Sequence, residues 1–309
     1  MSSLSTISVI IPSYERTNAL CDNISDLLVQ KHAPTEIIVI HQCPKPELES
    51  TQKLRDWAKE GRIRLYESSE ANAQKARNLG ILEARGEVLL FLDDDIRAPP
   101  QLVERHLLNY MEDPSLDGVV GQILRSGELP SGVFESRYFW PHIGWQNFPL
   151  NYVKRSPVKN WPSTNSSILR SVAMEIGGFD EQYGRTWLDD TDFSCRLLAR
   201  NAKLIFDPTA TVIHLRMPSG GKRLESRPDL WMDRMGWMTH FYFWRKNLGL
   251  WKARYPLLWN VRYLIFRKAV LVRPHWFFQN VWHLAQGYRD AARILREGAK
   301  YLRVRLPSK

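Results

Sequence analysis

Short apolar runs alternate with longer amphipathic stretches from residue 7 to residue 111. The runs at 7–11, 36–40 and 88–92 are almost entirely apolar, and 63–66 is a shorter run of the same kind. Such runs predict strands buried on both faces, while apolar residues at helical spacing between them predict helices. Alternating strands and helices predict an α/β fold in which a Rossmann-like, mostly parallel sheet lies between two helical layers, as an α/β/α sandwich.

The pattern changes after residue 96. The sequence pattern predicts a strand over residues 117–124 and a long, aromatic-rich loop over residues 125–160. We expect this loop to face the substrate as a wall or lid. Short strands are expected at 204–206 and 211–214, followed by a basic loop with paired glycines. From residue 229 to residue 305 the spacing is helical. We therefore expect an α/β domain over residues 1–228 and a helical C-terminal region over 229–309.

Charge separates these two parts. The whole chain has a net charge of +10, yet residues 245–309 contain 15 Lys and Arg against 2 acids, so the remainder carries a charge of −3. Seven of the twelve tryptophans lie between Trp231 and Trp282. Basic, aromatic-rich helices are typical of membrane interfaces with anionic lipids. A helical cap packed on the α/β domain is the alternative. No recognition motif indicates nucleic-acid binding.

Cysteine usage and hydropathy bear on the compartment. Three widely spaced cysteines (Cys21, Cys43 and Cys195) form no metal-binding spacing, and their odd, sparse count favours a reducing environment. The apolar run at 7–11 is too short for a signal peptide, and no run approaches the roughly 20 apolar residues of a bilayer span. We expect a cytoplasmic protein.

Three aspartates, Asp93, Asp94 and Asp95, directly follow the apolar run 88–92. A buried strand does not tolerate unpaired charge, so the strand must end there, at the carboxyl edge where open α/β sheets bind ligands. Adjacent carboxylates repel one another unless a cation is present, and hard oxygen ligands suit Mg²⁺ or Mn²⁺ held together with phosphates. A solvated acidic turn before the next helix is the alternative.

Five short motifs follow one another in a recognisable order. They are a strand ending in Pro12-Ser13-Tyr14, then Lys75–Gly80, Leu92–Asp95, Gly177–Glu181 and Asp189–Asp192. In this order they resemble the family-2 glycosyltransferases with the GT-A fold, over residues 5–225. The resemblance implies an inverting, metal-dependent transfer of a sugar from a nucleoside diphosphate to an acceptor hydroxyl, in the biosynthesis of a surface polysaccharide or glycolipid.

The resemblance also implies roles for the acids. Asp95 would be a metal ligand with Asp93 near the ribose, and Asp190 would be the base that deprotonates the acceptor, since an inverting displacement needs one base. Trp187 and Asp189 would lie on the acceptor side. Capping of the helix that begins here is the alternative for Asp189 and Asp190.

Further residues match positions that contact the donor or the metal in this family. Tyr14 would contact the base and Arg77 the diphosphate. Gln42 stands where relatives commonly have an aspartate, which leaves UDP, dTDP and GDP donors open. His214 would be a second metal ligand, with a structural role as the alternative. The full expected donor-side set is Pro12, Tyr14, Gln42, Arg77, Asp93, Asp94, Lys222 and Arg223.

The basic C-terminal region then suggests a lipid-linked or glycan acceptor, with the enzyme peripheral on the inner face of the cell membrane. Two alternatives remain. A nucleotidyltransferase would share the sheet and the metal-binding acids, but no Gly-rich phosphate loop follows Ile11. A non-catalytic lipid- or nucleic-acid-binding protein on a transferase scaffold would not need Asp93, Asp95 and Asp190.

Overall fold

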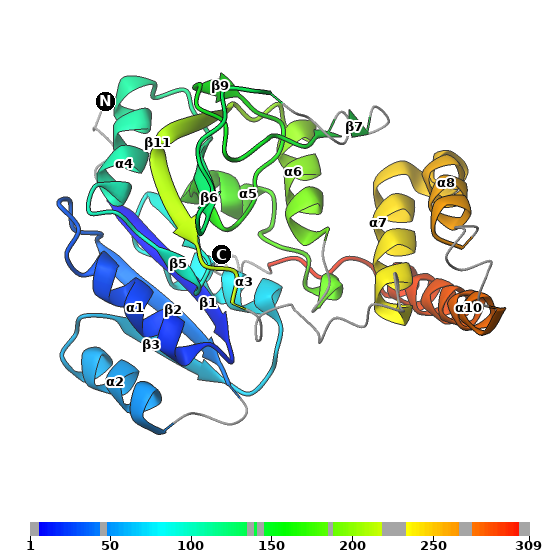
Figure 1. Cartoon of the computed structure of the whole chain (residues 1–309), viewed down its shortest axis with the longest axis horizontal. Helices are drawn as coiled ribbons and strands as arrows, with labels where there is room; N and C mark the ends of the chain where they lie inside the picture. Colours follow the sequence, from blue (N-terminus) through cyan, green and yellow to red (C-terminus); the bar gives the residue numbers. More distant parts are fainter. Residues whose placement is uncertain are drawn as a thin grey trace, which may run out of the picture.

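The computed structural model describes residues 6–43, 48–134, 139–140, 145–184, 188–217, 233–265 and 274–302. A twisted sheet with helices on both faces lies to one side of a group of C-terminal helices (Figure 1). The strands are β1 (Ile7–Tyr14), β2 (Glu36–Gln42), β3 (Arg64–Ser68), β4 (Val88–Leu92), β5 (Ile96–Arg97), β6 (Gly118–Arg125), β7 (Phe139–Trp140), β8 (Trp145–Gln146), β9 (Ser156–Pro157), β10 (Asn165–Leu169) and β11 (Leu204–His214). The helices are α1 (Thr17–Leu27), α2 (Leu48–Lys59), α3 (Ala73–Glu83), α4 (Leu102–Glu112), α5 (Arg170–Glu175), the 3₁₀ turn η2 (Glu181–Tyr183), α6 (Asp189–Ala199), α7 (Arg234–Lys252), α8 (Arg254–Ile265) and α10 (Pro274–Glu297).

The main sheet has the strand order β3-β2-β1-β4-β10-β6-β11-β5, and β9 pairs with β11. Strands β1 to β4 are parallel to one another, as are β6 and β11. β10 is antiparallel to both of its neighbours, β4 and β6. The chain reaches β10 from the carboxyl edge of the sheet, where the preceding loop runs, so it enters the sheet in the reverse direction. The expected α/β fold with a mostly parallel sheet is confirmed.

Alternate residues of β1 pack into two different cores. Ile7, Val9 and Ile11 belong to a cluster with α1, α2 and α4, whereas Ile10 packs with α3, α5 and α6 on the opposite face. Because successive side chains of a strand point to opposite faces, a strand that is apolar throughout must be covered on both sides. The two cores give the three-layer arrangement that the apolar runs predict.

β11 is one long strand, although the sequence predicts two short ones at 204–206 and 211–214. Both halves pair with β6, and the register shifts between Asp207 and Thr211. The interruption contains Pro208, which has no N–H for a ladder, and Asp207 accepts hydrogen bonds from the backbone N–H and the hydroxyl of Thr209. This bulge breaks the apolar pattern without ending the strand.

Among the C-terminal helices, α7 packs on the α/β domain and α10 packs on α7. α10 ends before Gly298, whose φ of +83° favours glycine, and the following residues return to the α/β domain, where the Leu302 N–H donates to the Gly177 carbonyl at 2.8 Å. The prediction of helix as far as residue 305 is therefore wrong for residues 298–302. Within the described part of the chain, no helix has the length and apolar character needed to cross a bilayer.

Candidate active site

A cavity of about 220 Å³ opens at the carboxyl edge of the sheet. Eight of the residues expected at the site line it, although Pro12 and His214 are 202 positions apart in the sequence. Trp187, Lys222 and Arg223 lie outside the described residues, and Asp95 and Asp189 are buried behind the wall. The lining consists of Pro12, Ser13, Tyr14, Arg16, Gln42, Ala71, Asn72, Ala73, Arg77, Asp93, Asp94, Ser163, Thr164, Asp190 and His214.

Asp93, Asp95 and His214 form a candidate metal centre. One ligand atom from each lies within 4.8 Å of the others, and His214 Nε2 is 3.1 Å from Asp95 Oδ1 and 3.7 Å from Asp93 Oδ2. Asp95 Oδ1 is buried, and no described residue gives it a well-aligned hydrogen bond. Two carboxylates and an imidazole, including one buried oxygen without a well-aligned hydrogen-bond donor, fit Mg²⁺ or Mn²⁺.

The neighbourhood of Asp95 favours its ionised form. Burial raises the pKa of this carboxyl, but His214, Arg16 and the backbone N–H of Met217 together hold the pKa below its usual value. The Arg16 guanidinium lies 3.1 Å from Asp95 Oδ2, and the Met217 N–H donates to the same oxygen at 3.0 Å. Asp95 is therefore ready to bind a cation as a carboxylate.

Asp94 points toward β1 and does not join the candidate metal centre. It accepts hydrogen bonds from the Ser13 hydroxyl at 2.8 Å and the Tyr14 N–H at 3.3 Å, and it pairs with Arg16 at 3.1 Å. Burial raises the pKa of Asp94 to about 6. Arg16, which we did not predict, thus supplies part of the positive charge expected beside the three acids. Its position just after β1, at the same edge of the sheet, is the signal that could have identified it.

Asp189 is held by α3. Its Oδ2 accepts a hydrogen bond from Gln74 Nε2 at 2.7 Å and one from Arg77 Nη1 at 3.0 Å, and all three residues are buried. Burial alone would lower the pKa of Arg77, but Asp190, Asp189 and Asp93 raise it above its usual value. Arg77 is therefore a fixed positive charge in the wall of the cavity. It is near Asp93, which follows β4, and near Asp189 and Asp190 of α6.

Asp190 lines the cavity from the first turn of α6. Its Oδ2 accepts a hydrogen bond from the Ser163 N–H at 3.2 Å, and its carbonyl accepts one from the Ser194 hydroxyl at 2.7 Å. The N-cap position is occupied by Leu188, which has a φ of +75°, and not by either aspartate. The capping alternative therefore loses its main support, and the Asp190 carboxylate is presented to the cavity.

Gln42 is buried in the wall of the cavity, and its amide nitrogen donates two hydrogen bonds within the protein. Nε2 donates to the carbonyls of Glu70 at 2.5 Å and Asn72 at 3.0 Å. Both amide hydrogens are then satisfied, so the amide orientation is set and Oε1 is the acceptor that Gln42 can offer to a ligand.

A second cavity, of about 600 Å³, adjoins the first and shares Thr164 and His214 with it. Its wall includes residues 147–151 and parts of 123–133, so segments of the long loop expected to face the substrate do lie beside the candidate site. Thr164 also donates to Asp93 Oδ2 at 2.9 Å. Together with Ser163, it is a site residue that the sequence pattern did not reveal.

The family model described as "Glycosyl transferase family 2" matches residues 8–177. A glucosyl-dolichyl phosphate glucuronosyltransferase from Haloferax volcanii is 24% identical over 182 residues, 58% of this chain and 57% of that protein. The O-antigen biosynthesis protein RfbC from Myxococcus xanthus is 23% identical over 245 residues, 74% of this chain and 18% of that protein. A pre-mycofactocin glycosyltransferase from Mycobacterium tuberculosis is 30% identical over 141 residues, 45% of this chain and 29% of that protein.

These matches cover less than two thirds of the length of each relative. Among solved structures, a crystal structure of GalNAc-T7 with UDP, GalNAc and Mn²⁺ superposes with a TM-score of 0.57 at 18% identity, and covers 70% of this chain and 44% of that chain. At this level of identity the likeness concerns the fold.

Proposed function

Because the chain belongs to glycosyl transferase family 2 and has the GT-A fold, we propose that it transfers a sugar from a nucleoside diphosphate donor to an acceptor hydroxyl with inversion at the anomeric carbon. The observation that carries this proposal is the cavity that combines three groups of residues: Tyr14 and Gln42 from β1 and β2, Asp93 and His214 from the candidate metal centre, and Asp190 from α6. Family membership favours this activity over the nucleotidyltransferase and non-catalytic alternatives.

The leaving group is a nucleoside diphosphate, and its growing negative charge needs positive partners. Asp93, Asp95 and His214 would hold Mg²⁺ or Mn²⁺, which supplies this charge when bound. Arg77, fixed in the wall by Asp189, faces the same cavity. Lys222 and Arg223, which follow β11 in the sequence, would add further positive charge.

Asp190 is the proposed base. The acceptor oxygen forms a bond to the anomeric carbon while the bond from that carbon to the phosphate oxygen breaks, and the hydroxyl proton passes to the Asp190 carboxylate. A single displacement of this kind inverts the anomeric configuration and needs one base on the side opposite the leaving group. Trp187 and Asp189, which precede Asp190 in the sequence, would shape the acceptor side.

The nucleotide would be bound where β1 and β2 end. Tyr14 and Pro12 line this part of the cavity and offer a surface for the base. Oε1 of Gln42 can accept a hydrogen bond from a ring N–H, which uracil, thymine and guanine all present. The proposed donors are therefore UDP-, dTDP- or GDP-linked sugars.

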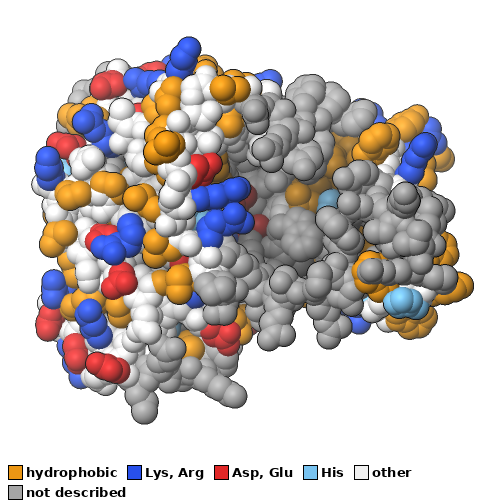
Figure 2. Space-filling view, in the orientation of Figure 1, with side chains coloured by type: hydrophobic (Ala, Val, Ile, Leu, Met, Phe, Trp, Pro, Cys, Tyr) orange, Lys and Arg blue, Asp and Glu red, His pale blue; other side chains and the backbone are white. Residues whose placement is uncertain are grey.

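The proposed acceptor is a glycan or lipid-linked glycan at the inner face of the cell membrane. The helices α8 and α10 and the end of α7 expose large apolar side chains, including Trp251 at 73% and Phe278 at 70% exposure, and Figure 2 shows hydrophobic side chains at the surface of α8 and α10. Basic residues such as Arg254 and Arg262 accompany them. Such a surface fits peripheral binding to anionic lipids. The Haloferax volcanii relative is named for a dolichyl phosphate substrate, which is consistent with a lipid carrier.

The donor site is tested by measuring the melting temperature with UDP, dTDP or GDP, each with and without Mn²⁺ or Mg²⁺. One nucleotide should raise it by several degrees only when the metal is present, because a ligand at 100 times its Kd adds about 2.7 kcal/mol of stability. Asp95→Ala should lose this metal-dependent shift, and Asp56→Ala, an exposed carboxylate on α2, should keep it. Failure of every nucleotide to stabilise the wild-type protein with metal would contradict the proposal.

A further inference from the structure

A buried lysine of α7 joins the C-terminal helices to the α/β domain. Lys246 Nζ lies 2.7 Å from Asp180 Oδ2 and 2.7 Å from Asp192 Oδ1, and its side chain is 13% exposed. Both carboxylates are fully buried. Burial lowers the pKa of Lys246, but Asp192 and Asp180 raise it above its usual value, so the lysine is charged.

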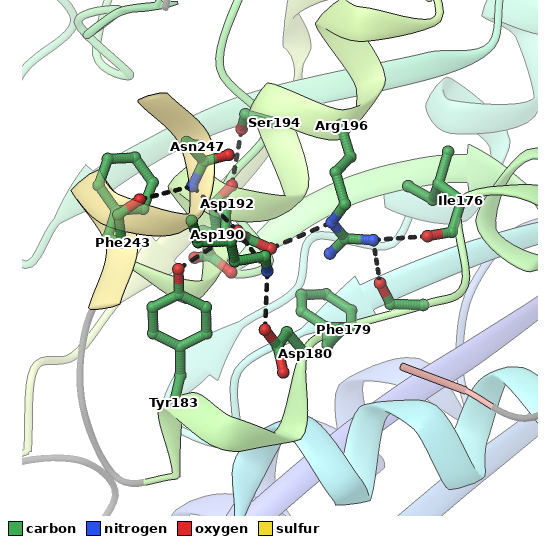
Figure 3. A network of polar contacts seen from close by, with 12 residues as sticks. Ile176, Phe179, Asp180, Tyr183, Asp190, Asp192, Ser194, Arg196, Phe243 and Asn247 are labelled. Carbon is green, nitrogen blue, oxygen red and sulfur yellow. Dashed lines mark hydrogen bonds and ion pairs between the residues drawn. The ribbon is translucent and has the colours of Figure 1, made fainter. Parts of the chain in front are cut away.

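Each of the two acids is part of a wider polar network. Asp180 also accepts hydrogen bonds from the Tyr242 hydroxyl at 2.5 Å and the Lys300 N–H at 3.0 Å. Figure 3 shows Asp192 surrounded by Tyr183, Arg196 and Asn247, whose donor atoms lie 3.0 to 3.3 Å away. Neither acid lines the candidate active site. Asp180 and Asp192 each belong to one of the five sequence motifs. They thus connect the α/β domain to α7 and to the residues that follow α10.

The connection reaches the first turn of α6, which carries the proposed base. Asp192 follows Asp190 by two residues, and its own N–H donates to the Leu188 carbonyl at 2.8 Å. The same turn contains Asp189, which pairs with Arg77 of α3. Leu188, just before the turn, has the left-handed φ of +75°, a conformation that a leucine keeps only when its surroundings impose it. Ion pairs from both α3 and α7 thus hold this turn.

We propose that Lys246 is a positioning residue, which sets the place of Asp190 through Asp192 and so makes the C-terminal helical region part of the catalytic apparatus. This inference rests on the proposed function of Asp190. It also explains why a charged group is buried here. Removing one partner leaves an uncompensated buried charge, so the first turn of α6 loses its fixed position.

The test compares Lys246→Met and Asp192→Asn with Arg234→Gln. The control removes a different ion pair of α7, in which Arg234 Nη2 lies 2.9 Å from Asp290 of α10, away from α6. In Lys246→Met and Asp192→Asn the kcat for UDP-glucose hydrolysis (or for the dTDP or GDP analogue) should fall about 10- to 100-fold, because small misplacements of a catalytic group have effects of this size. The KM for the donor should stay within twofold of the wild-type value. The increase in melting temperature that the nucleotide causes should also stay within twofold of the wild-type increase. Arg234→Gln should behave like wild type.

Hydrogen exchange provides a readout that needs no substrate. The amides of residues 192–196 should exchange faster in Lys246→Met and Asp192→Asn but not in Arg234→Gln. If Lys246→Met does not fold, Asp192→Asn answers the question, since it keeps the shape of the side chain. Unchanged kcat and unchanged exchange in the folded variants would overturn the inference, and so would a loss of donor binding in proportion to kcat. An inactive wild-type protein would instead count against the proposed function, while the exchange result would still test the positioning.

Discussion

Burial and partners distinguish aspartates that are equivalent in the sequence. Asp93, Asp94 and Asp95 are consecutive, yet Asp94 bonds to β1 while the other two face His214. In the same way, Asp189 pairs with Arg77, Asp190 faces the cavity and Asp192 binds Lys246. A turn or the start of a helix points consecutive side chains in different directions, so each acid meets a different set of neighbours.

The role of Asp190 gives a prediction at this scale. Asp190→Asn should lower kcat by roughly 10²- to 10⁴-fold, the usual contribution of a positioned general base. Metal-dependent nucleotide binding should be retained, because the proposed metal ligands are Asp93, Asp95 and His214. The rate of sugar transfer or of donor hydrolysis measures kcat, and a thermal-shift titration measures nucleotide binding. Transfer at the wild-type rate would refute the assignment of the base.

His106 gives a second prediction, on stability. Its ring is buried in α4 and contacts the Ser167 hydroxyl at 2.9 Å and Asn165 Oδ1 at 3.1 Å. Burial lowers the pKa of His106 to about 4 from 6.5. Between these pH values the unfolded chain binds a proton that the folded chain does not, so stability falls as the pH drops from about 6.5 to about 4.

The expected contribution of His106 to this loss is about 3 kcal/mol in the free energy of unfolding, at 1.36 kcal/mol for each pKa unit. Urea unfolding at pH 7.5 and pH 4.5 measures it. His106→Gln should be less stable at pH 7.5 but should show a smaller loss on acidification than the wild type. His32→Gln, which changes an exposed histidine, is the control. Equal losses in the wild type and in His106→Gln would contradict the prediction.

At the scale of elements, β10 shows how a polar segment becomes a central strand. Asn165, Ser166 and Ser167 are all buried between β4 and β6. Asn165 donates to the carbonyls of Gln122 and Ala210 at 3.0 and 2.8 Å, so its polar atoms do not remain unsatisfied. The sequence around β10 has no apolar run from which a buried strand could be predicted. Its burial depends instead on hydrogen bonds with residues that are distant in the sequence.

Helix packing in the C-terminal region gives a third prediction. Gly287 of α10 lies so close to α7 that an added Cβ would be 2.7 Å from the Met238 nitrogen and 2.8 Å from the Arg234 carbonyl oxygen. Both are backbone atoms, so the helices would have to move apart. Gly287→Ala should therefore destabilise the protein by about 1–3 kcal/mol despite the higher helix propensity of alanine. Thermal or urea unfolding measures this. A gain in stability would show that α7 and α10 can separate at little cost.

At the scale of the whole molecule, the aromatic residues of the C-terminal region serve two different purposes. Trp237, Phe243 and Trp244 of α7 are buried with Tyr183 of the α/β domain. Trp251, at the end of α7, and Trp259 of α8 are 73% and 69% exposed. The two interpretations of this region, a helical cap and a lipid-binding surface, therefore apply to different parts of it. The buried part of α7 is the cap, and the surface formed by the end of α7, α8 and α10 remains the candidate for membrane binding.

This division predicts the outcome of vesicle binding. The wild-type protein should bind vesicles containing anionic lipid, more weakly as salt is raised. The double variant Trp251→Ser/Trp259→Ser should bind about 10- to 100-fold more weakly, because each exposed tryptophan would bury apolar area in the interface. Leu129→Ser, which changes a leucine of the α/β domain that is 81% exposed, is the control. Co-sedimentation measures the binding. Equal binding by all three proteins would exclude this surface.

The sequence by itself determined the α/β class, the strands that end at the site, the family and most of the residues that line the cavity. It could do so because apolar periodicity and short motifs are local properties, and because parallel strands bring their carboxyl ends to one edge. The tertiary structure alone decided which groups meet: Arg16 with Asp94, Asp189 with Arg77, and Lys246 with Asp180 and Asp192. The partners in these pairs lie 54 to 112 positions apart in the sequence. A local sequence pattern shows which chemical group a side chain carries, but the tertiary packing determines which other group it contacts.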